Sequence, residues 1–202
     1  MKKLFREVPY IAILRGIQSE EVLEYAQVLV NLNFPVIEVP LNSPDPLESI
    51  ELLARNYRNR VVIGAGTVIN ERDVVEVYHA GGKIIVMPHC NETIVALSKQ
   101  MGMYCVAGVS TISEAFTALQ AGADMLKFFP ASSLNPQLIK DWQTVLPEET
   151  MIFPVGGITP VNMDPFWKLG ASGFGLGSAL YKAGLGLGPF KKNAEAFIKA
   201  LS

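Results

Sequence analysis

Short hydrophobic runs recur along the chain, and each is followed by a longer segment whose apolar residues have helical spacing. The runs are four or five residues long and rich in β-branched side chains, which is typical of buried strands. We predict eight strands, at residues 10–14, 36–39, 61–65, 84–87, 104–107, 125–129, 151–155 and 173–176. Strands that alternate with helices in this way indicate parallel βαβ units.

Polar residues and glycines between these strands mark the expected helix ends. The residues placed to act as helix N-caps are Ser19, Ser43, Asn70, Asn91, Thr111, Asn135 and Thr159. The residues placed just after helices, where a left-handed backbone is needed, are Asn33, Gly81, Gly102, Gly122 and Gly170. Thr111 and Glu114 have the spacing of a capping box, so we interpret Glu114 as structural and not catalytic.

The repeated units predict one (β/α)8 barrel domain over residues 1–202, near the lower end of the size range for this fold. Residues 2–8 are expected to form a short helix that closes the N-terminal mouth of the barrel. The last helix is expected to begin near Pro189, after a glycine-rich connection at 184–188. An open doubly wound sheet is the alternative, but the first strand–helix turn lacks a G-x-G-x-x-G motif.

Composition and charge exclude several classes of protein. Half of the residues are hydrophobic, 18% are charged, and the formal net charge is -2, which gives no electrostatic reason to expect a nucleic acid partner. Basic residues form no cluster for a membrane surface, and the apolar runs are too short to span a bilayer. The N-terminus lacks the pattern of a signal peptide, so we expect a cytosolic protein in which Cys90 and Cys105 are reduced core thiols.

Residues that can carry chemistry collect at the C-terminal ends of the predicted strands, where (β/α)8 barrels place their active sites. They are Arg15, Glu38, Asn42, Thr67, Pro88, His89, Gly108 and Lys127. Lys127 stands out because an unpaired ammonium buried in an apolar strand costs several kcal/mol or is forced neutral. A neutral lysine in a dry pocket is a nucleophile that forms a Schiff base with a ketone. The alternative is a structural lysine paired with one buried carboxylate.

Glu38 is the natural partner of Lys127, because a carboxylate inside a β-branched strand must be paired or hydrogen-bonded. Glu38 either neutralises the lysine or serves as the acid/base beside a nucleophile. Asn42 shares its side of the extended chain if the strand continues that far. His89 and Cys90 have no further ligand at metal spacing, and we therefore reject a metal site.

Two glycine-rich loops predict an anion site. Gly156-Gly157 follows the seventh strand, Gly177-Ser178 follows the eighth, and each precedes an expected helix start, with 178–182 as a short extra helix. Backbone N–H groups in front of a helix N-terminus bind anions, and these two loops are the usual phosphate site of the fold. Tight barrel packing is the alternative reason for the glycines.

Over essentially its whole length the chain resembles the class I aldolases that act on 2-keto-3-deoxy-6-phosphosugar acids. The motifs that carry the resemblance are Ile-Leu-Arg15-Gly, Glu38-Val-Pro-Leu-Asn42-Ser-Pro, Gly64-Ala-Gly-Thr67-Val, Lys127-Phe-Phe-Pro130, Gly156-Gly157-Ile and Gly177-Ser178. Within this family the chain is most similar to the galactonate type. The gluconate type has Arg at the position of Asn42 and Thr at the position of Val155.

The resemblance implies a carbon–carbon lyase that cleaves 2-dehydro-3-deoxy-6-phosphogalactonate to pyruvate and D-glyceraldehyde 3-phosphate. Lys127 would form the Schiff base and Glu38 would shuttle protons. The implied substrate-binding residues are Arg15 and Thr67 at the carboxylate or nearby hydroxyls, Asn42 at a hydroxyl, Val155 at the subtype position, Pro88 and Phe129 as apolar walls, and Gly156, Gly157, Gly177 and Ser178 at the phosphate. No metal or organic cofactor is implied, and family members are commonly homotrimers.

Three other functions remain open from the sequence. The first is the same cleavage of the gluconate epimer. The second is a phosphosugar isomerase or epimerase, which needs paired acid/base residues but no covalent lysine. The third is a barrel that binds a phosphorylated ligand without catalysis. The presence of both Lys127 and Glu38 in barrel strands argues against this third function.

Overall fold

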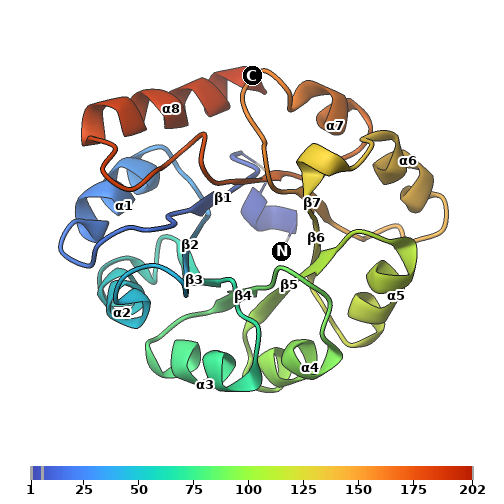
Figure 1. Ribbon diagram of the computed structural model, residues 1–202, viewed down its shortest axis with the longest axis horizontal. Helices are drawn as coiled ribbons and strands as arrows, with labels where there is room; N and C mark the ends of the chain where they lie inside the picture. The colour runs from blue at the N-terminus through green and yellow to red at the C-terminus, as the bar shows by residue number, and fades with distance from the viewer. Residues whose placement is uncertain (1, 6, 202) are drawn as a thin grey trace.

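A ring of parallel strands forms the centre of the molecule, and helices surround it (Figure 1). The computed structural model describes residues 2–5 and 7–201. Within them the strands are β1 (Tyr10–Ile13), β2 (Val36–Pro40), β3 (Val62–Gly66), β4 (Ile84–Val86), β5 (Tyr104–Val109), β6 (Met125–Phe128), β7 (Ile152–Pro154) and β8 (Phe174–Leu176). Neighbours in sequence are neighbours in the sheet, and β8 also pairs with β1. A bridge between Val155 and Gly175 joins β7 to β8 and completes the predicted (β/α)8 barrel.

The helices pack their apolar faces on the outside of this ring. They are α1 (Val22–Asn31), α2 (Pro46–Tyr57), α3 (Glu71–His79), α4 (Glu92–Gln100), α5 (Ile112–Gln120), α6 (Gln137–Gln143), α7 (Asp164–Lys168) and α8 (Leu187–Ala200), with 3-10 turns η1 (Lys2–Phe5) and η2 (Ala131–Ser133). Alternate strand residues point outward into the main core, as Ile37 and Leu126 do. No helix among the described residues is long and apolar enough to span a bilayer.

The inward-facing residues near the N-terminal ends of the strands form a second hydrophobic cluster. Its members come from several strands and include Ile11, Val36, Val106 and Phe153. Phe5 of η1 belongs to the same cluster, and its ring lies 4.8 Å from that of Phe153. The N-terminal turn ends at Phe5 and is shorter than the expected helix over 2–8, in which residue 6 lies outside the described residues. Apolar side chains therefore fill this end of the barrel interior, and the polar inward-facing residues lie toward the other end.

The observed helix ends match the predicted signals only in part. Asn70, Asn91 and Thr111 accept backbone hydrogen bonds at the starts of their helices, and Thr111 forms the predicted capping box with Glu114. The residues predicted to follow helices have positive φ, namely Asn33, Gly81, Gly102, Gly122 and Gly170. Three predicted caps do not begin helices, namely Ser19, Ser43 and Thr159, because the helices that follow start at Val22, Pro46 and Asp164. The hydroxyl of Ser43 instead accepts a hydrogen bond from the N–H of Gly16 at 2.9 Å.

Candidate active site

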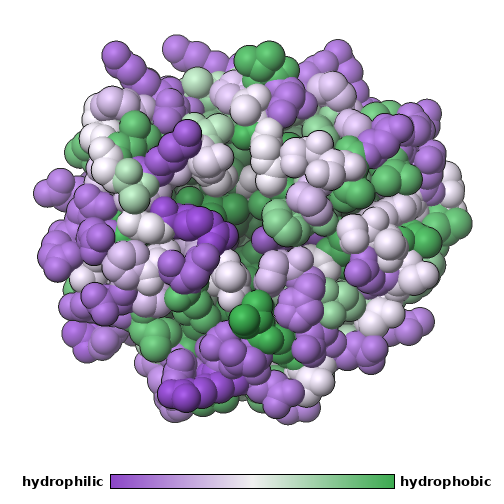
Figure 2. Space-filling view, viewed as in Figure 1, coloured by the Kyte–Doolittle hydropathy of each residue, from purple (hydrophilic) through white to green (hydrophobic). Residues whose placement is uncertain are grey.

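A cavity of about 560 Å³ opens at the C-terminal ends of the strands, and Figure 2 shows a hollow at the middle of the ring. Every residue predicted to act in catalysis or substrate binding lines this cavity except Asn42, whereas His89 and Gly108, also named at the strand ends, lie outside the lining. The predicted residues in the lining are Arg15, Glu38, Thr67, Pro88, Lys127, Phe129, Val155, Gly156, Gly157, Gly177 and Ser178. They come from all parts of the chain, and the parallel barrel brings them together because every strand ends at the same rim.

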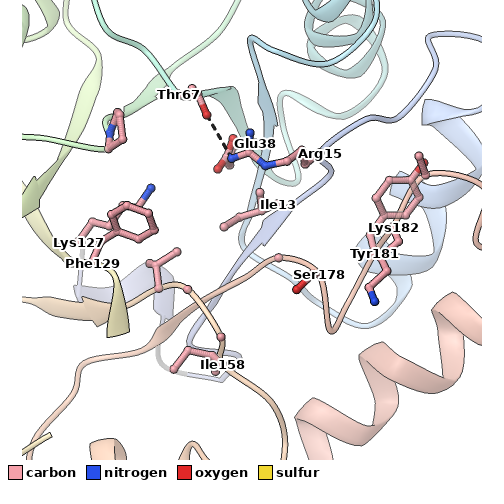
Figure 3. A pocket seen from close by; sticks show the side chains of 16 residues that line it. Ile13, Arg15, Glu38, Thr67, Lys127, Phe129, Ile158, Ser178, Tyr181 and Lys182 are labelled. Carbon is pink, nitrogen blue, oxygen red and sulfur yellow. Dashed lines mark hydrogen bonds between the residues drawn. The ribbon is translucent and has the colours of Figure 1, made fainter. Parts of the chain in front are cut away.

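Lys127 rises from β6 into the cavity. Its neighbours in the sheet are Gly108 of β5 and Phe153 of β7, and its exposed fraction is only 6%. The Nζ atom lies 4.5 Å from the centre of the Phe129 ring (Figure 3). Burial lowers the pKa of Lys127; the negative charge of Glu38 opposes this shift, and the positive charge of Arg15 adds to it. A larger share of the amine is therefore neutral and nucleophilic near pH 7 than for a lysine in water.

Glu38 enters the cavity from β2, where it lies between Ile13 of β1 and Gly64 of β3. Its exposed fraction is 2%, and its Oε2 atom has no hydrogen-bond partner among the described residues. Burial raises the pKa of Glu38 from 4.5 to about 7, although the positive charges of Lys127 and Arg15 act against the shift. A carboxyl group with a pKa near 7 can both donate and accept a proton at physiological pH.

The predicted direct pairing of Lys127 with Glu38 is not formed. Neither a hydrogen bond nor an ion pair joins the two side chains in the described part of the chain, although each charge shifts the pKa of the other group. Both side chains reach into the same space from different strands (Figure 3). A ligand in this cavity can therefore meet both the amine and the carboxyl group.

Arg15 is held by two neighbouring side chains. One guanidinium nitrogen donates to Oδ1 of Asn42 at 2.5 Å. The other donates to Oγ1 of Thr67 at 3.2 Å, the bond drawn as a dashed line in Figure 3. Thr67 has a left-handed backbone with φ 58°, which is uncommon for a residue other than glycine. β2 ends at Pro40, so the extended geometry expected as far as Asn42 does not persist. Asn42 is exposed outside the cavity lining, and among the described residues its side chain is linked to the site through Arg15.

Gly66 makes room for the Glu38 carboxyl group, a role that the sequence analysis did not detect. A Cβ atom built at this position would lie 1.8 Å from Oε2 and 2.3 Å from Cδ of Glu38. Such a contact is far inside van der Waals distance, so the carboxyl group must move if the residue is not glycine. The sequence signal for this role is that β3, the neighbour of the strand that carries Glu38, contains two glycines, Gly64 and Gly66.

We expect Gly66→Ala to lower kcat for the reaction of this site by roughly 100-fold, because a displacement of about 1 Å is enough for a loss of that size. The pH dependence of kcat should also change, since the displaced carboxyl group loses its present burial. Steady-state kinetics across pH measure both effects. Gly188→Ala is the matched control, because a methyl group there meets nothing within 4 Å. Equal kinetics for Gly66→Ala and the control would contradict the role of Gly66.

The two glycine-rich loops line the same cavity as Lys127, with Gly156 next to the Phe129 ring and Ser178 across the cavity from the lysine (Figure 3). Gly156 and Gly157 have φ 96° and 74°, a conformation that glycine adopts without strain. No described residue accepts a hydrogen bond from the backbone N–H groups of Gly157, Gly177 or Ser178. These donors and the hydroxyl of Ser178 are available to an anion in the cavity.

The expectation that helix N-termini stand directly behind these loops is wrong. α7 begins only at Asp164, and the segment after Gly177 is a single turn in which Leu180 and Tyr181 donate to the carbonyl of Gly177. Loop amides, rather than helix dipoles, therefore supply the donors at this end.

The cavity lining also includes residues that the sequence analysis did not single out as site residues, namely Ile13, Ile158, Tyr181, Lys182 and Ala183. No cluster of His, Cys, Asp and Glu residues within the described ranges could hold a metal ion.

Comparisons with known proteins agree with this arrangement. Residues 1–193 match the family described as "Aldolase: KDPG and KHG aldolase". The chain is 40% identical to 2-dehydro-3-deoxy-6-phosphogalactonate aldolase of Escherichia coli over 96% of its own length and 95% of that protein. It is similar to a solved structure described as native KDPGal, with TM-score 0.94, 40% identity and coverage of 96% and 95% of the two chains.

A second solved structure is similar to the chain at lower sequence identity. It is KDPG aldolase from Legionella pneumophila with pyruvate captured as a covalent carbinolamine intermediate. The TM-score is 0.81, the identity is 25%, and the similarity covers 99% of this chain and 94% of the other.

Proposed function

The chain belongs to the KDPG and KHG aldolase family and is a carbon–carbon lyase, and we propose that it cleaves 2-dehydro-3-deoxy-6-phosphogalactonate through a Schiff base on Lys127. The products are pyruvate and D-glyceraldehyde 3-phosphate. The observation that carries this proposal is a buried lysine of lowered pKa that shares its cavity with a carboxyl group of pKa about 7. A nucleophilic amine and an acid/base carboxyl group at one ligand site are the two groups that cleavage of a 2-keto acid through a Schiff base requires.

Lys127 begins the reaction as a nucleophile. Its neutral amine adds to the C2 ketone to give a carbinolamine, which loses water to form a protonated imine. The C3–C4 bond then breaks, its electrons pass into the imine, and the aldehyde leaves while a pyruvate enamine remains on the lysine. Protonation of C3 and hydrolysis of the imine release pyruvate and restore the free amine. The carbinolamine of the Legionella relative supports the first step for the family.

Glu38 moves the protons that these steps require. As an acid it protonates the carbinolamine hydroxyl so that water can leave, and as a base it accepts the proton of the C4 hydroxyl during cleavage. It then returns a proton to C3 of the enamine. One residue can serve both purposes because the pKa of its carboxyl group is raised to about 7.

The side chains around Lys127 fix the pyruvate half of the substrate. The guanidinium of Arg15, oriented by Asn42 and Thr67, can bind the carboxylate of the 2-keto acid through charge-assisted hydrogen bonds. Pro88 and Phe129 are apolar walls of the same region and keep water away from the amine. The free N–H groups of Gly157, Gly177 and Ser178, which line the same cavity, are the proposed donors to the 6-phosphate.

The galactonate epimer is the proposed substrate because the residues at two positions, Asn42 and Val155, match the galactonate-type enzymes. By family resemblance the gluconate-type enzymes have Arg at Asn42 and Thr at Val155, and the identity to the galactonate-type relative, 40%, exceeds the 25% to the KDPG aldolase of Legionella. Val155 lines the cavity and offers no hydrogen bond to a substrate hydroxyl. A threonine there would add a donor and acceptor that favours one orientation of the C4 hydroxyl.

We expect kcat/KM for the galactonate epimer to exceed that for the gluconate epimer by at least about tenfold, a ratio that one hydroxyl contact can produce. Val155→Thr should shift this ratio toward the gluconate epimer without loss of the Schiff base. Coupled assays of pyruvate release with the two pure epimers measure the ratio. A clear preference of the wild type for the gluconate epimer would contradict the substrate assignment but leave the aldolase chemistry intact.

A homotrimer and a cytosolic location are further proposals, and both rest on the resemblance to the family.

A further inference from the structure

Lys182 lies on the cavity wall at the same end as the glycine-rich loops. It belongs to the segment that follows β8, lines the cavity together with Ser178, and is exposed to solvent (Figure 3). The sequence predicts a short extra helix over 178–182 and no chemical role for Lys182 itself. Its ammonium group forms no ion pair within the described part of the chain. The charge is therefore free to meet a ligand.

The charges around the cavity are divided between its two ends. Within the described ranges, the basic residues of the lining are Arg15, Lys127 and Lys182. Arg15 is engaged by Asn42 and Thr67, and the amine of Lys127 rests over the Phe129 ring. The donors at the other end are neutral amides and a hydroxyl. A phosphate dianion placed there has no compensating positive charge unless Lys182 supplies it.

The backbone that carries Lys182 is tied to two helices. The Tyr181 hydroxyl donates to Oε1 of Glu21 at 2.9 Å, just before α1, and the Tyr25 hydroxyl of α1 donates to the carbonyl of Leu185. From α8, Nδ2 of Asn193 donates to the carbonyl of Leu180 at 3.1 Å. These bonds fix residues on both sides of Lys182. Its side chain thus extends from a fixed point at the rim, and less ordering is needed when a ligand binds.

We propose that Lys182 binds the phosphate group of the substrate and sets the preference for phosphorylated over unphosphorylated 2-keto acids. This inference rests on the proposed function and adds to it the residue that recognises the phosphate charge. Lys182 takes no part in the covalent chemistry, which occurs at Lys127. Lys182 therefore contributes to the affinity for the substrate, and only when the substrate carries the phosphate dianion.

Lys182→Gln is expected to lower kcat/KM for the phosphorylated substrate by roughly 10- to 100-fold, the range for the loss of one charge-assisted hydrogen bond. The loss should appear in KM, with kcat changed less than about threefold, because the contact forms already in the bound substrate. The value of kcat/KM for the same sugar acid without phosphate should stay the same within error. Lys182→Arg should restore most of the affinity, since it keeps the charge.

The matched control is Lys140→Gln, which removes one exposed lysine of α6 outside the cavity. A selective loss for the phosphorylated substrate in Lys182→Gln, absent in the control, supports the proposal. No loss, or an equal loss for both substrates, overturns it.

Calorimetric titration with glycerol 3-phosphate separates this inference from the aldolase mechanism, because it needs no turnover. Weaker binding by Lys182→Gln and not by Lys140→Gln supports the phosphate role even if pyruvate forms no adduct on Lys127. Equal binding by both variants overturns the role even if the aldolase reaction is demonstrated.

Discussion

Lys127→Met is expected to lower kcat for aldol cleavage by at least about 10⁴-fold, because removal of a covalent nucleophile eliminates the path through the imine. Methionine has nearly the same length as lysine and no amine. It should also pack well in this site, since the buried side chain lies against the Phe129 ring and an apolar group there has no desolvation cost. The thermal midpoint of the variant should thus equal or exceed that of the wild type.

The measurement is single-turnover cleavage of the phosphorylated substrate, with Lys140→Met as the control for a lost surface lysine. If the variant is folded but does not cleave the substrate, the loss of activity is due to the missing amine and not to unfolding. Cleavage within tenfold of the wild-type rate would contradict the nucleophilic role of Lys127 and would indicate a cleavage mechanism without a covalent lysine.

Glu38→Gln is the second variant with a large expected effect, a loss in kcat of roughly 10²- to 10⁴-fold. The amide keeps the shape of the side chain and cannot exchange a proton at physiological pH. The variant should still form the covalent adduct with pyruvate, only more slowly, because Lys127 remains. Full activity of Glu38→Gln would show that another group moves the protons.

The pH dependence of Glu38→Gln should differ from that of the wild type in a defined direction. Burial raises the pKa of Glu38 from 4.5 to about 7, so between these values the native state binds a proton that the unfolded state releases. The wild type should therefore lose stability as pH rises through this window, and Glu38→Gln should not show this loss. Any limb of the wild-type kcat/KM profile that follows the titration of Glu38 near pH 7 should also vanish in the variant. Denaturant unfolding and kinetics at the same series of pH values test both statements.

The barrel could be predicted from sequence because its signals are local. Each strand is a β-branched run, and glycine or asparagine follows the helices at positions such as Asn33 and Gly81, where positive φ is observed. Helix starts were less predictable. Serine and threonine favour N-caps, but the hydroxyl of Ser43 accepts a hydrogen bond from the N–H of Gly16 in another loop. Whether a serine caps a helix or makes such a bond depends on residues distant in sequence.

The membership of the candidate site was predictable, but its internal contacts were not. Strand ends converge in any parallel barrel, so Lys127 and Glu38 could be placed in one cavity without coordinates. The space between their side chains, the engagement of Asn42 by Arg15 and the role of Gly66 under the carboxyl group depend on distances of a few ångströms across strands. Periodicity carries no information on such distances.

The formation of a Schiff base on Lys127 is tested most directly by reductive trapping. The protein is incubated with pyruvate and sodium borohydride, digested, and analysed by mass spectrometry, with Lys127→Met as the control. We predict that one reduced pyruvate adduct forms, on the peptide that contains Lys127, and that it is absent from the variant. An unmodified Lys127 under conditions in which pyruvate is shown to bind would contradict the mechanism.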